Sequence, residues 1–367
     1  MSRPDAPIGT VAAAAFRIPT DAPEADGTIT WSHTTLVVVE LTAGNARGLG
    51  YTYADTATVR LIHDELAEVV TGHDALDVPE VFFAAAAHAR NLGRPGITSM
   101  ALSALDTAMW DLKAKLLDVP LARLLGRVRP AVPVYGSGGF TSYDVEQLQR
   151  QLAGWVDQGI PRVKMKIGAQ PADDLRRVRA ARAAIGEGPE LFVDANGAYA
   201  RKQALRLAEQ FAPLGVTWFE EPVSSDDLEG LHLLRDRGPA GMDLAAGEYG
   251  YAMVYFKRML DAGAVDVLQA DATRCGGFTG FMRVAALCDA AKVPLSAHCA
   301  PSLHVHVGCA AEAMRHLEYF HDHVRIEHML FDGARDPVNG ALAPDLSRAG
   351  LGLELKRKRK EAAKYAV

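Results

Sequence analysis

The sequence predicts an α/β protein in which a smaller α+β region precedes a barrel of eight parallel strands. Three observations favour this fold class. From about residue 130 onwards, short apolar segments alternate with amphipathic ones, as they do in a parallel sheet with crossover helices. The residues before this point show strand patterns first and helical patterns afterwards. Polar residues follow the predicted strands in step with the repeat. An open, doubly wound sheet is the alternative for the repeating part.

The first region contains two segments that predict a β-hairpin. Residues 33–43 and 46–54 are rich in Val, Leu, Thr and Tyr, and Gly44 and Asn45 between them suit a tight turn. The preceding segment, 18–31, is rich in Pro, Asp and Thr. This composition predicts a long loop, and long loops are often functional.

Helical spacing follows in residues 56–72, 79–92 and 99–117. The third of these segments places a stripe of apolar side chains on one helical face. The stripe consists of Leu102, Leu105, Ala108, Met109 and Leu112. Two prolines in the stretch 128–136 then indicate a boundary near residue 128.

Beyond this boundary, eight short segments have the character of strands. They are residues 132–137, 162–168, 191–197, 217–223, 243–248, 267–271, 294–299 and 316–320. Amphipathic segments that end at glycine lie between several of them. Eight such units over roughly 200 residues suit a closed (β/α)₈ barrel.

Polar side chains lie near the carboxyl end of each strand from the second to the eighth. They are Lys164, Lys166, Asp194, Asn196, Glu220, Glu221, Glu248, Asp271, His298 and Glu318. The carboxyl ends of parallel barrel strands converge on one mouth, where active sites form. We therefore expect these side chains to share one site.

Three of these residues predict a metal site. Asp194, Glu220 and Glu248 come from consecutive strands, and three carboxylates at one mouth repel each other unless a cation lies among them. Oxygen ligands without cysteine or histidine favour Mg²⁺ over Zn²⁺, with one ion per site. Strand alternation points Glu221 away from Glu220, which predicts a structural role behind the site.

The lysines and the histidine predict acid/base chemistry. Lys164 and Lys166 lie on one face of their strand, and the charge of Lys164 together with a nearby cation would lower the pKa of Lys166. Lys166 is therefore a candidate base. Asp271 and His298 end neighbouring strands, where a hydrogen bond between them would fix the imidazole tautomer.

Composition excludes several other classes of function. The net charge of −6 does not favour nucleic acid or an anionic membrane, and we interpret the basic run at 356–360 as a solvated face. The four cysteines form no CxxC pair, which is typical of reduced thiols. No apolar signal segment or long apolar run is present. These features predict a soluble, cytoplasmic protein.

The ordered set of motifs resembles one family along nearly the whole chain. The matching motifs are KMK (164–166), DANG (194–197), EEP (220–222), GE (247–248), DATRCGG (271–277), SAHCAP (296–301) and LE (317–318). Residues 103–126 are similar to the helix and linker that precede the barrel in that family. The sequence is thereby identified as a member of the enolase superfamily, and within it of the mandelate racemase group.

The resemblance implies a modified TIM barrel over residues 128–344. A capping domain over residues 1–127 would cover it, with the tail 345–367 returning to that domain. It implies Mg²⁺ on Asp194, Glu220 and Glu248, where the metal would bind a substrate carboxylate and stabilise an enediolate. Lys166 would be the base on one face, and the His298–Asp271 dyad would serve the other. Lys164 and Glu318 would stabilise the enediolate oxygens.

The resemblance implies a lyase or isomerase that acts on a small-molecule carboxylate, in a chain that forms a homo-oligomer. Dehydration of a sugar acid to a 2-keto-3-deoxy acid is the preferred reaction. Racemisation or epimerisation of a 2-hydroxy acid passes through the same enediolate and stays open. A non-catalytic binding or regulatory relative is a third class, but such a protein should have lost ligands or bases.

Substrate contacts are expected from the segment 18–31 and from the turn near residues 51–54. Hydroxyl and aromatic side chains there suit a sugar acid, and two further candidates follow barrel strands. The candidate substrate-binding residues are Thr20, Trp31, Tyr51, Tyr53, Asn196 and Arg274.

Overall fold

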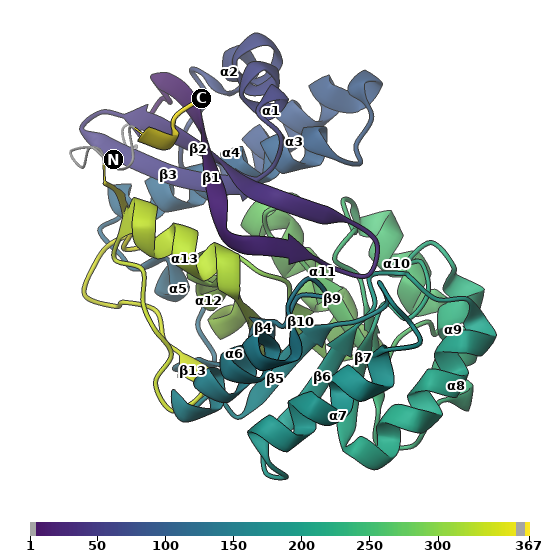
Figure 1. Cartoon of the computed structure of the whole chain (residues 1–367). Coiled ribbons are helices and arrows are strands. Elements are labelled where there is room, and N and C mark those ends of the chain that lie inside the picture. The colour runs from purple at the N-terminus through teal and green to yellow at the C-terminus, as the bar shows by residue number, and fades with distance from the viewer. Residues whose placement is uncertain (1–4, 357–363) are drawn as a thin grey trace.

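The computed structural model describes residues 5–356 and 364–367 (Figure 1). A three-stranded antiparallel sheet with its helices lies above the barrel, and we call this region the cap. Its strands, in the order β1-β2-β3, are Thr10–Ala25, Thr30–Ala43 and Ala46–Tyr53. Gly44 and Asn45 join β2 to β3, and Ala43 pairs with Ala46, so the predicted hairpin is confirmed.

The predicted long loop at 18–31 is wrong. β1 continues to Ala25, β2 begins at Thr30, and the strand register shifts once, between Pro19 and Glu24. β1 lies at the edge of the three-stranded sheet, where a proline that lacks an N–H removes no hydrogen bond from a central ladder. Prolines in this segment therefore marked an edge strand with a bulge.

The helices of the cap cover one face of this sheet. They are α1 (Ala57–Leu61), η1 (Ile62–Leu66), α2 (Ala67–Val70), α3 (Val78–His88), η2 (Ala89–Leu92) and α4 (Ile97–Leu116). Two glycines of β3 let α4 approach closely. A Cβ at Gly48 would lie 2.2 Å from the carbonyl oxygen of Ala108, and one at Gly50 would lie 2.3 Å from that of Ala104. Only glycine fits at these two positions.

Eight parallel strands close the barrel below the cap. They are β4 (Val132–Gly138), β5 (Arg162–Lys166), β6 (Glu190–Asp194), β7 (Val216–Glu220), β8 (Asp243–Ala246), β9 (Val267–Ala270), β10 (Leu295–Ala297) and β11 (Met314–Phe320). Each strand pairs with the next, and β11 pairs with β4. This closure confirms the predicted barrel and excludes the open sheet.

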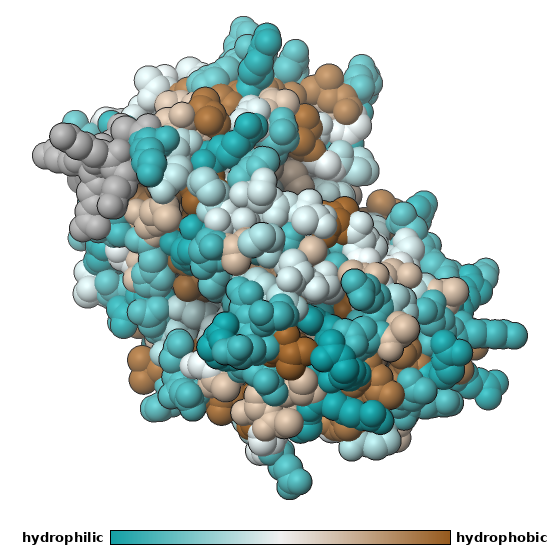
Figure 2. Space-filling view, viewed as in Figure 1, coloured by the Kyte–Doolittle hydropathy of each residue, from teal (hydrophilic) through white to brown (hydrophobic). Residues whose placement is uncertain are grey.

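Helices surround the barrel, and short strands follow it. The helical elements are α5 (Leu121–Leu124), α6 (Val145–Asp157), α7 (Asp174–Ile185), α8 (Arg201–Phe211), η3 (Ala212–Leu214), α9 (Leu228–Arg237), α10 (Met253–Asp261), α11 (Gly277–Ala291), α12 (Pro301–Ala310) and α13 (His321–Leu330). The short strands are β12 (Phe331–Asp332), β13 (Ala341–Leu342) and β14 (Glu354–Leu355). On the face shown in Figure 2, apolar residues are scattered among polar ones. Within residues 5–356 and 364–367, no helix has the length and apolar character needed to cross a membrane.

The end of the chain returns to the cap. Ala366 forms a bridge with Phe16 of β1, and the backbone N–H of Val367 donates a hydrogen bond to the carbonyl of Ala15. Most of the basic run at 356–360, from residue 357 on, lies outside the described residues. The domain boundaries at residues 127/128 and 344/345 stay predictions.

Asp111 of α4 connects three parts of the chain. Its buried carboxylate accepts hydrogen bonds from the backbone N–H of Leu49 and of Leu351, each at 2.7 Å, and it pairs with Lys115 at 2.6 Å. We expect Asp111→Ala to lower the free energy of unfolding by about 3 kcal/mol, because it leaves two buried donors unpaired. Urea denaturation measures this loss.

Asp64→Ala is the matched control. Asp64 is exposed and forms an ion pair with exposed Arg60, so its loss should cost less than about 1 kcal/mol. Equal losses in the two variants would contradict the proposed role of Asp111.

Candidate active site

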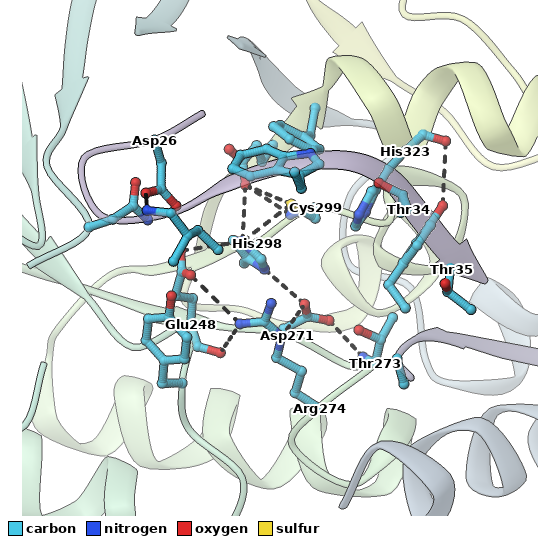
Figure 3. Close-up of a pocket in the computed structure, with 18 of the residues that line it drawn as sticks. Asp26, Thr34, Thr35, Glu248, Asp271, Thr273, Arg274, His298, Cys299 and His323 are labelled. Atoms are coloured by element: carbon cyan, nitrogen blue, oxygen red, sulfur yellow. Dashed lines mark hydrogen bonds and ion pairs between the residues drawn. The ribbon is translucent and has the colours of Figure 1, made fainter. Parts of the chain in front are cut away.

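A cavity of about 390 Å³ lies where the β1–β2 hairpin and the end of β3 meet the carboxyl end of the barrel. Its lining joins polar residues of the cap to charged residues of the barrel, as Figure 3 shows for ten labelled side chains. The cap contributes Asp26, Ile29, Trp31, His33, Thr34, Thr35, Tyr53, Ala54 and Asp55. The barrel side contributes Lys166, Asn196, Glu248, Tyr249, Asp271, Thr273, Arg274, His298, Cys299, Glu318, Phe320 and His323.

Strand register aligns the charged residues at this mouth. Lys166 lies opposite Asp194, and Asp194 lies opposite Glu220 in the next strand pair. Lys166 forms a short ion pair with Asp194 and lines the cavity. Parallel pairing therefore brings these side chains together, as the sequence predicted.

Lys164 lies below the cavity and is fully buried. Its Nζ is 2.6 Å from Glu220 Oε1, 2.9 Å from Glu318 Oε1 and 3.3 Å from Asp194 Oδ2. Ser137 donates a further hydrogen bond to Glu318. One ammonium group thus holds three carboxylates in fixed positions.

Asp194, Glu220 and Glu248 could hold a metal ion. Each offers one oxygen, and these oxygens lie within 4.8 Å of one another. Glu248 Oε2 is buried and has no hydrogen bond, although His298 Nε2 lies 3.3 Å from it. A set of three carboxylate oxygens suits the hard cation Mg²⁺.

The electrostatics of the carboxylates also favour a cation. Burial, and next the charge of Asp194, raise the pKa of Glu220 to about 8. Burial also raises the pKa of Asp194, but Lys166 and Lys164 outweigh it and bring the pKa down to about 2. The two lysines therefore do not neutralise every carboxylate in the cluster, and an additional positive charge would stabilise the cluster.

Lys164 lowers the pKa of Lys166, as predicted, but it is only one of several charges that act on this pKa. Burial and Lys164 each lower this pKa, but Asp194, Glu248 and Glu220 together outweigh them. The protein groups alone thus raise the pKa of Lys166 above its ordinary value. A divalent cation on the same carboxylates would oppose this rise.

Strand alternation does not describe Glu221. β7 ends at Glu220, and Glu221 has a φ of 37°, in the left-handed region. Its side chain is buried, with Oε1 lacking a hydrogen-bond partner. Burial, followed by the charge of Glu248, raises its pKa. Glu221 is therefore a buried carboxylate close to Glu248, and it is not among the residues that line the cavity.

Asp271 and His298 form the predicted pair at the ends of β9 and β10. His298 Nδ1 donates to Asp271 Oδ2 at 2.8 Å, which leaves Nε2 directed to the cavity (Figure 3). Burial lowers the pKa of His298, but Glu248 and the hydrogen bond to Asp271 outweigh burial and raise it. Burial raises the pKa of Asp271, but His298 outweighs it and holds that pKa below its usual range.

Four of the six expected substrate contacts lie in the cavity wall. They are Trp31, Tyr53, Asn196 and Arg274. Tyr51 does not reach it, because the side chain is fully buried and its hydroxyl donates to Glu327 at 2.6 Å. Thr20 lies within the register shift of β1 and is also outside the lining.

Several lining residues have no local signal in the sequence. His33, Thr34 and Thr35 belong to β2, and they line the cavity only because the hairpin docks on the barrel. His323 of α13 stacks on Tyr53, with ring centroids 3.3 Å apart. These positions depend on contacts between segments far apart in the chain.

Two family models match the chain. Residues 10–126 match the model described as mandelate racemase / muconate lactonizing enzyme, N-terminal domain. Residues 147–359 match the model described as enolase C-terminal domain-like.

Three similar proteins add to these matches. L-talarate/galactarate dehydratase of Salmonella typhimurium LT2 is 31% identical over 78% of this chain and 73% of its own. Its structure with Mg and L-lyxarohydroxamate has a TM-score of 0.90 at 27% identity, covering 100% of this chain and 95% of that one. 3,6-Anhydro-alpha-L-galactonate cycloisomerase of Streptomyces coelicolor is 32% identical over 85% of this chain and 87% of its own. A mandelate racemase/muconate lactonizing enzyme-like protein from Rubrobacter xylanophilus has a TM-score of 0.96 at 55% identity, covering 98% and 99% of the two chains.

Mg²⁺ should stabilise this fold through Asp194. At a Mg²⁺ concentration about 100-fold above Kd, one bound ion adds about 2.7 kcal/mol to the free energy of unfolding. We expect Asp194→Asn to lose most of this gain, because it removes one of three oxygen ligands. Thermal melting with and without Mg²⁺ measures the effect.

Asp173→Asn is the control for this measurement. Asp173 pairs with Arg176 through hydrogen bonds on the surface, away from the cavity. The Mg²⁺-dependent shift should persist in that variant. A full shift in Asp194→Asn would rule out the assigned metal site.

Proposed function

This chain belongs to the enolase superfamily, in its mandelate racemase group, and we propose that it dehydrates a sugar acid to a 2-keto-3-deoxy acid. Membership makes it an enzyme of the lyase or isomerase type that uses Mg²⁺. The observation that carries the proposal is the pair of acid/base groups at one cavity. Lys166 reaches the cavity from β5 and His298 from β10, across the barrel mouth.

We assign Asp194, Glu220 and Glu248 as the residues that hold Mg²⁺. When bound, the ion would supply positive charge to the carboxylate of the substrate and so acidify the neighbouring C–H bond. The orphaned Glu248 Oε2 and the raised pKa of Glu220, caused by burial and then Asp194, both support this assignment.

Lys166 is the proposed base. In its neutral form, Nζ takes the proton from the carbon next to the carboxylate, and the electron pair of that C–H bond enters the enediolate. The ammonium of Lys164 is proposed to stabilise the enediolate oxygens, and the carboxylate of Glu318 to hold that ammonium in position. Their mutual ion pair of 2.9 Å holds both groups in place without rearrangement.

His298 is the proposed acid. Its Nε2 proton passes to the β-hydroxyl as the C–O bond breaks, so that water leaves and an enol remains, which becomes the 2-keto acid. Asp271 accepts from Nδ1, which keeps the second proton of the imidazolium on Nε2 and aimed at the cavity. Lys166 and His298 line the same cavity from strands that are not neighbours, which supports proton removal and delivery on two sides of one substrate.

The cavity wall suits a polyhydroxylated acid. Thr34, Thr35 and Thr273 offer hydroxyl or backbone groups, and Arg274 offers a cation beside them. Trp31 and Tyr53 add flat surfaces against which a sugar carbon chain packs. Trp31, Tyr53, Asn196 and Arg274 are the proposed substrate-binding residues, while the expected homo-oligomer and cytoplasmic location stay predictions.

Two other reactions compete with dehydration. Delivery of a proton to the opposite face of the same enediolate would make the enzyme a racemase or epimerase, and both bases needed for it are present. Similarity to the Streptomyces coelicolor 3,6-anhydro-alpha-L-galactonate cycloisomerase makes a cycloisomerase reaction the second candidate. The complete set of carboxylates, lysines and dyad argues against a non-catalytic relative.

Incubation with mono- and diacid sugars plus Mg²⁺ tests the proposal. We expect a 2-keto acid from at least one acid sugar, and loss of product with EDTA. Keto acid from a lactone or anhydro acid only would favour the cycloisomerase. Solvent deuterium at the α-carbon without keto acid would favour the racemase, and neither product nor exchange would exclude all three.

The variants Lys166→Ala and His298→Asn test which group removes the α-proton from each face of the substrate. For a substrate whose α-proton faces Lys166, exchange in D₂O should vanish in Lys166→Ala and persist in His298→Asn, because only the base for that face is needed. The epimer should show the reverse. Equal loss of exchange in both variants for one epimer would contradict the two-sided assignment.

Removal of Asp271 should change the pH profile of dehydration. His298 acts as an acid only when protonated, so activity falls as pH rises through its pKa. Asp271→Asn removes a charge that raises this pKa, so the alkaline decline should begin at lower pH. The maximal rate should fall on the order of 100-fold, since the imidazole loses its fixed tautomer.

Asp26→Asn is the control for the pH profile. Asp26 also lines the cavity, but its carboxylate accepts from the backbone of Thr28 and Ile29. The alkaline decline should stay where it is in the unaltered enzyme. An unchanged decline in Asp271→Asn would exclude His298 as the acid.

A further inference from the structure

A second group of possible metal ligands lies outside the catalytic cavity. Asp21 and Glu24 come from the bulged end of β1, and His321 begins α13 of the barrel. One ligand atom from each lies within 4.8 Å of the others. Asp21 Oδ2 is 3.0 Å from His321 Nε2, so the cap and barrel already touch at this point.

Glu24 provides an independent sign of a missing partner. Its side chain is fully buried, at 0% exposure, although it carries a carboxylate. Oε2 accepts a hydrogen bond from Trp31 Nε1 at 2.7 Å, but Oε1 is buried without a partner. An unpaired buried carboxylate oxygen is costly, so a ligand that binds it would be stabilising.

The nearby protein cation does not fill this role. Arg325 donates to Asp322 and to the carbonyl of Pro19, and its buried Nε has no hydrogen-bond partner, so Arg325 does not bind Glu24 Oε1. Asp21 places a second carboxylate beside Glu24, so an added positive charge would be attracted to this point.

We propose that Asp21, Glu24 and His321 hold a divalent transition-metal ion, with Zn²⁺ as the ion of best fit. One imidazole nitrogen and two carboxylate oxygens are typical zinc ligands, and a water molecule can complete the tetrahedron. The catalytic group differs, because its three carboxylates offer oxygen only and favour Mg²⁺. The two sites thus select different ions.

The ion would brace one wall of the cavity. Trp31 is held by Glu24, packs edge-to-face on Phe140 with centroids 5.5 Å apart, and lines the cavity. His321 follows β11, three residues beyond Glu318. A metal between Glu24 and His321 would therefore join the tryptophan wall to a strand end of the catalytic cluster.

Zinc titration of the untagged, Mg²⁺-saturated enzyme tests the proposal. Calorimetry counts Zn²⁺ sites per chain in the unaltered enzyme, Asp21→Asn and His321→Gln. We expect each variant to bind one Zn²⁺ fewer. Asp21 is exposed and His321 partly exposed, so neither change should prevent folding, which melting curves check.

Asp336→Asn is the matched control. Asp336 and His328 form an exposed pair, also 3.0 Å apart. Within residues 5–356 and 364–367, this pair belongs to no group of three possible metal ligands. This variant should keep the full Zn²⁺ count. Equal counts in all four proteins, loss of a site in Asp336→Asn, or only millimolar affinity at the proposed site would overturn it. With Co²⁺ in place of Zn²⁺, the visible absorption band should vanish in His321→Gln.

Discussion

Charge balance at the barrel mouth is the constraint on which the rest of this structure depends. Lys164 is fully buried, and its ammonium contacts Asp194, Glu220 and Glu318. An unpaired charge in such a place costs several kcal/mol, so each strand end must arrive in the correct register. A slip of one residue in β5 would direct Met165 toward the carboxylates and leave them without a lysine. The strands of the barrel can therefore pair correctly only where the charges of Lys164 and its three carboxylates also meet.

The aromatic layer below the mouth fixes the geometry of this cluster. Tyr135, Phe192 and Trp218 fill the barrel interior together with Ala245 and Val267. Trp218 Nε1 donates to Glu220 Oε2 at 2.9 Å, and the ammonium of Lys164 lies 5.3 Å from the centre of the Tyr135 ring. Because these rings exclude water, the charges above them interact strongly and keep one orientation. The apolar layer and the charged layer thus form one functional unit.

The barrel and its charged residues could be predicted from the sequence, because the strands and the polar residues that follow them recur with the same spacing. A polar side chain at each strand end is visible in the linear chain, so Lys166, Asp194 and His298 could be identified together. The edge strand β1 could not, because its prolines and acids are also the residues of loops. Tyr51 was misplaced for a related reason: its hydroxyl pairs with Glu327, which lies 276 positions away. Docking of the cap on the barrel decides such positions, and no local pattern encodes it.

The contacts that hold the cap differ from those that hold the catalytic cluster. Thr52 donates to the carbonyl of Thr273 at 2.8 Å, and Thr34 donates to Asp322. Both contacts join the cap to segments that follow the strands, whereas the cluster pairs the strand ends with each other. The two sets share no residue, so a substitution in the hairpin can reshape the cavity wall while the ion pairs of Lys164 stay intact. The shape of the cavity wall and the position of the acid/base groups are therefore separable in this fold.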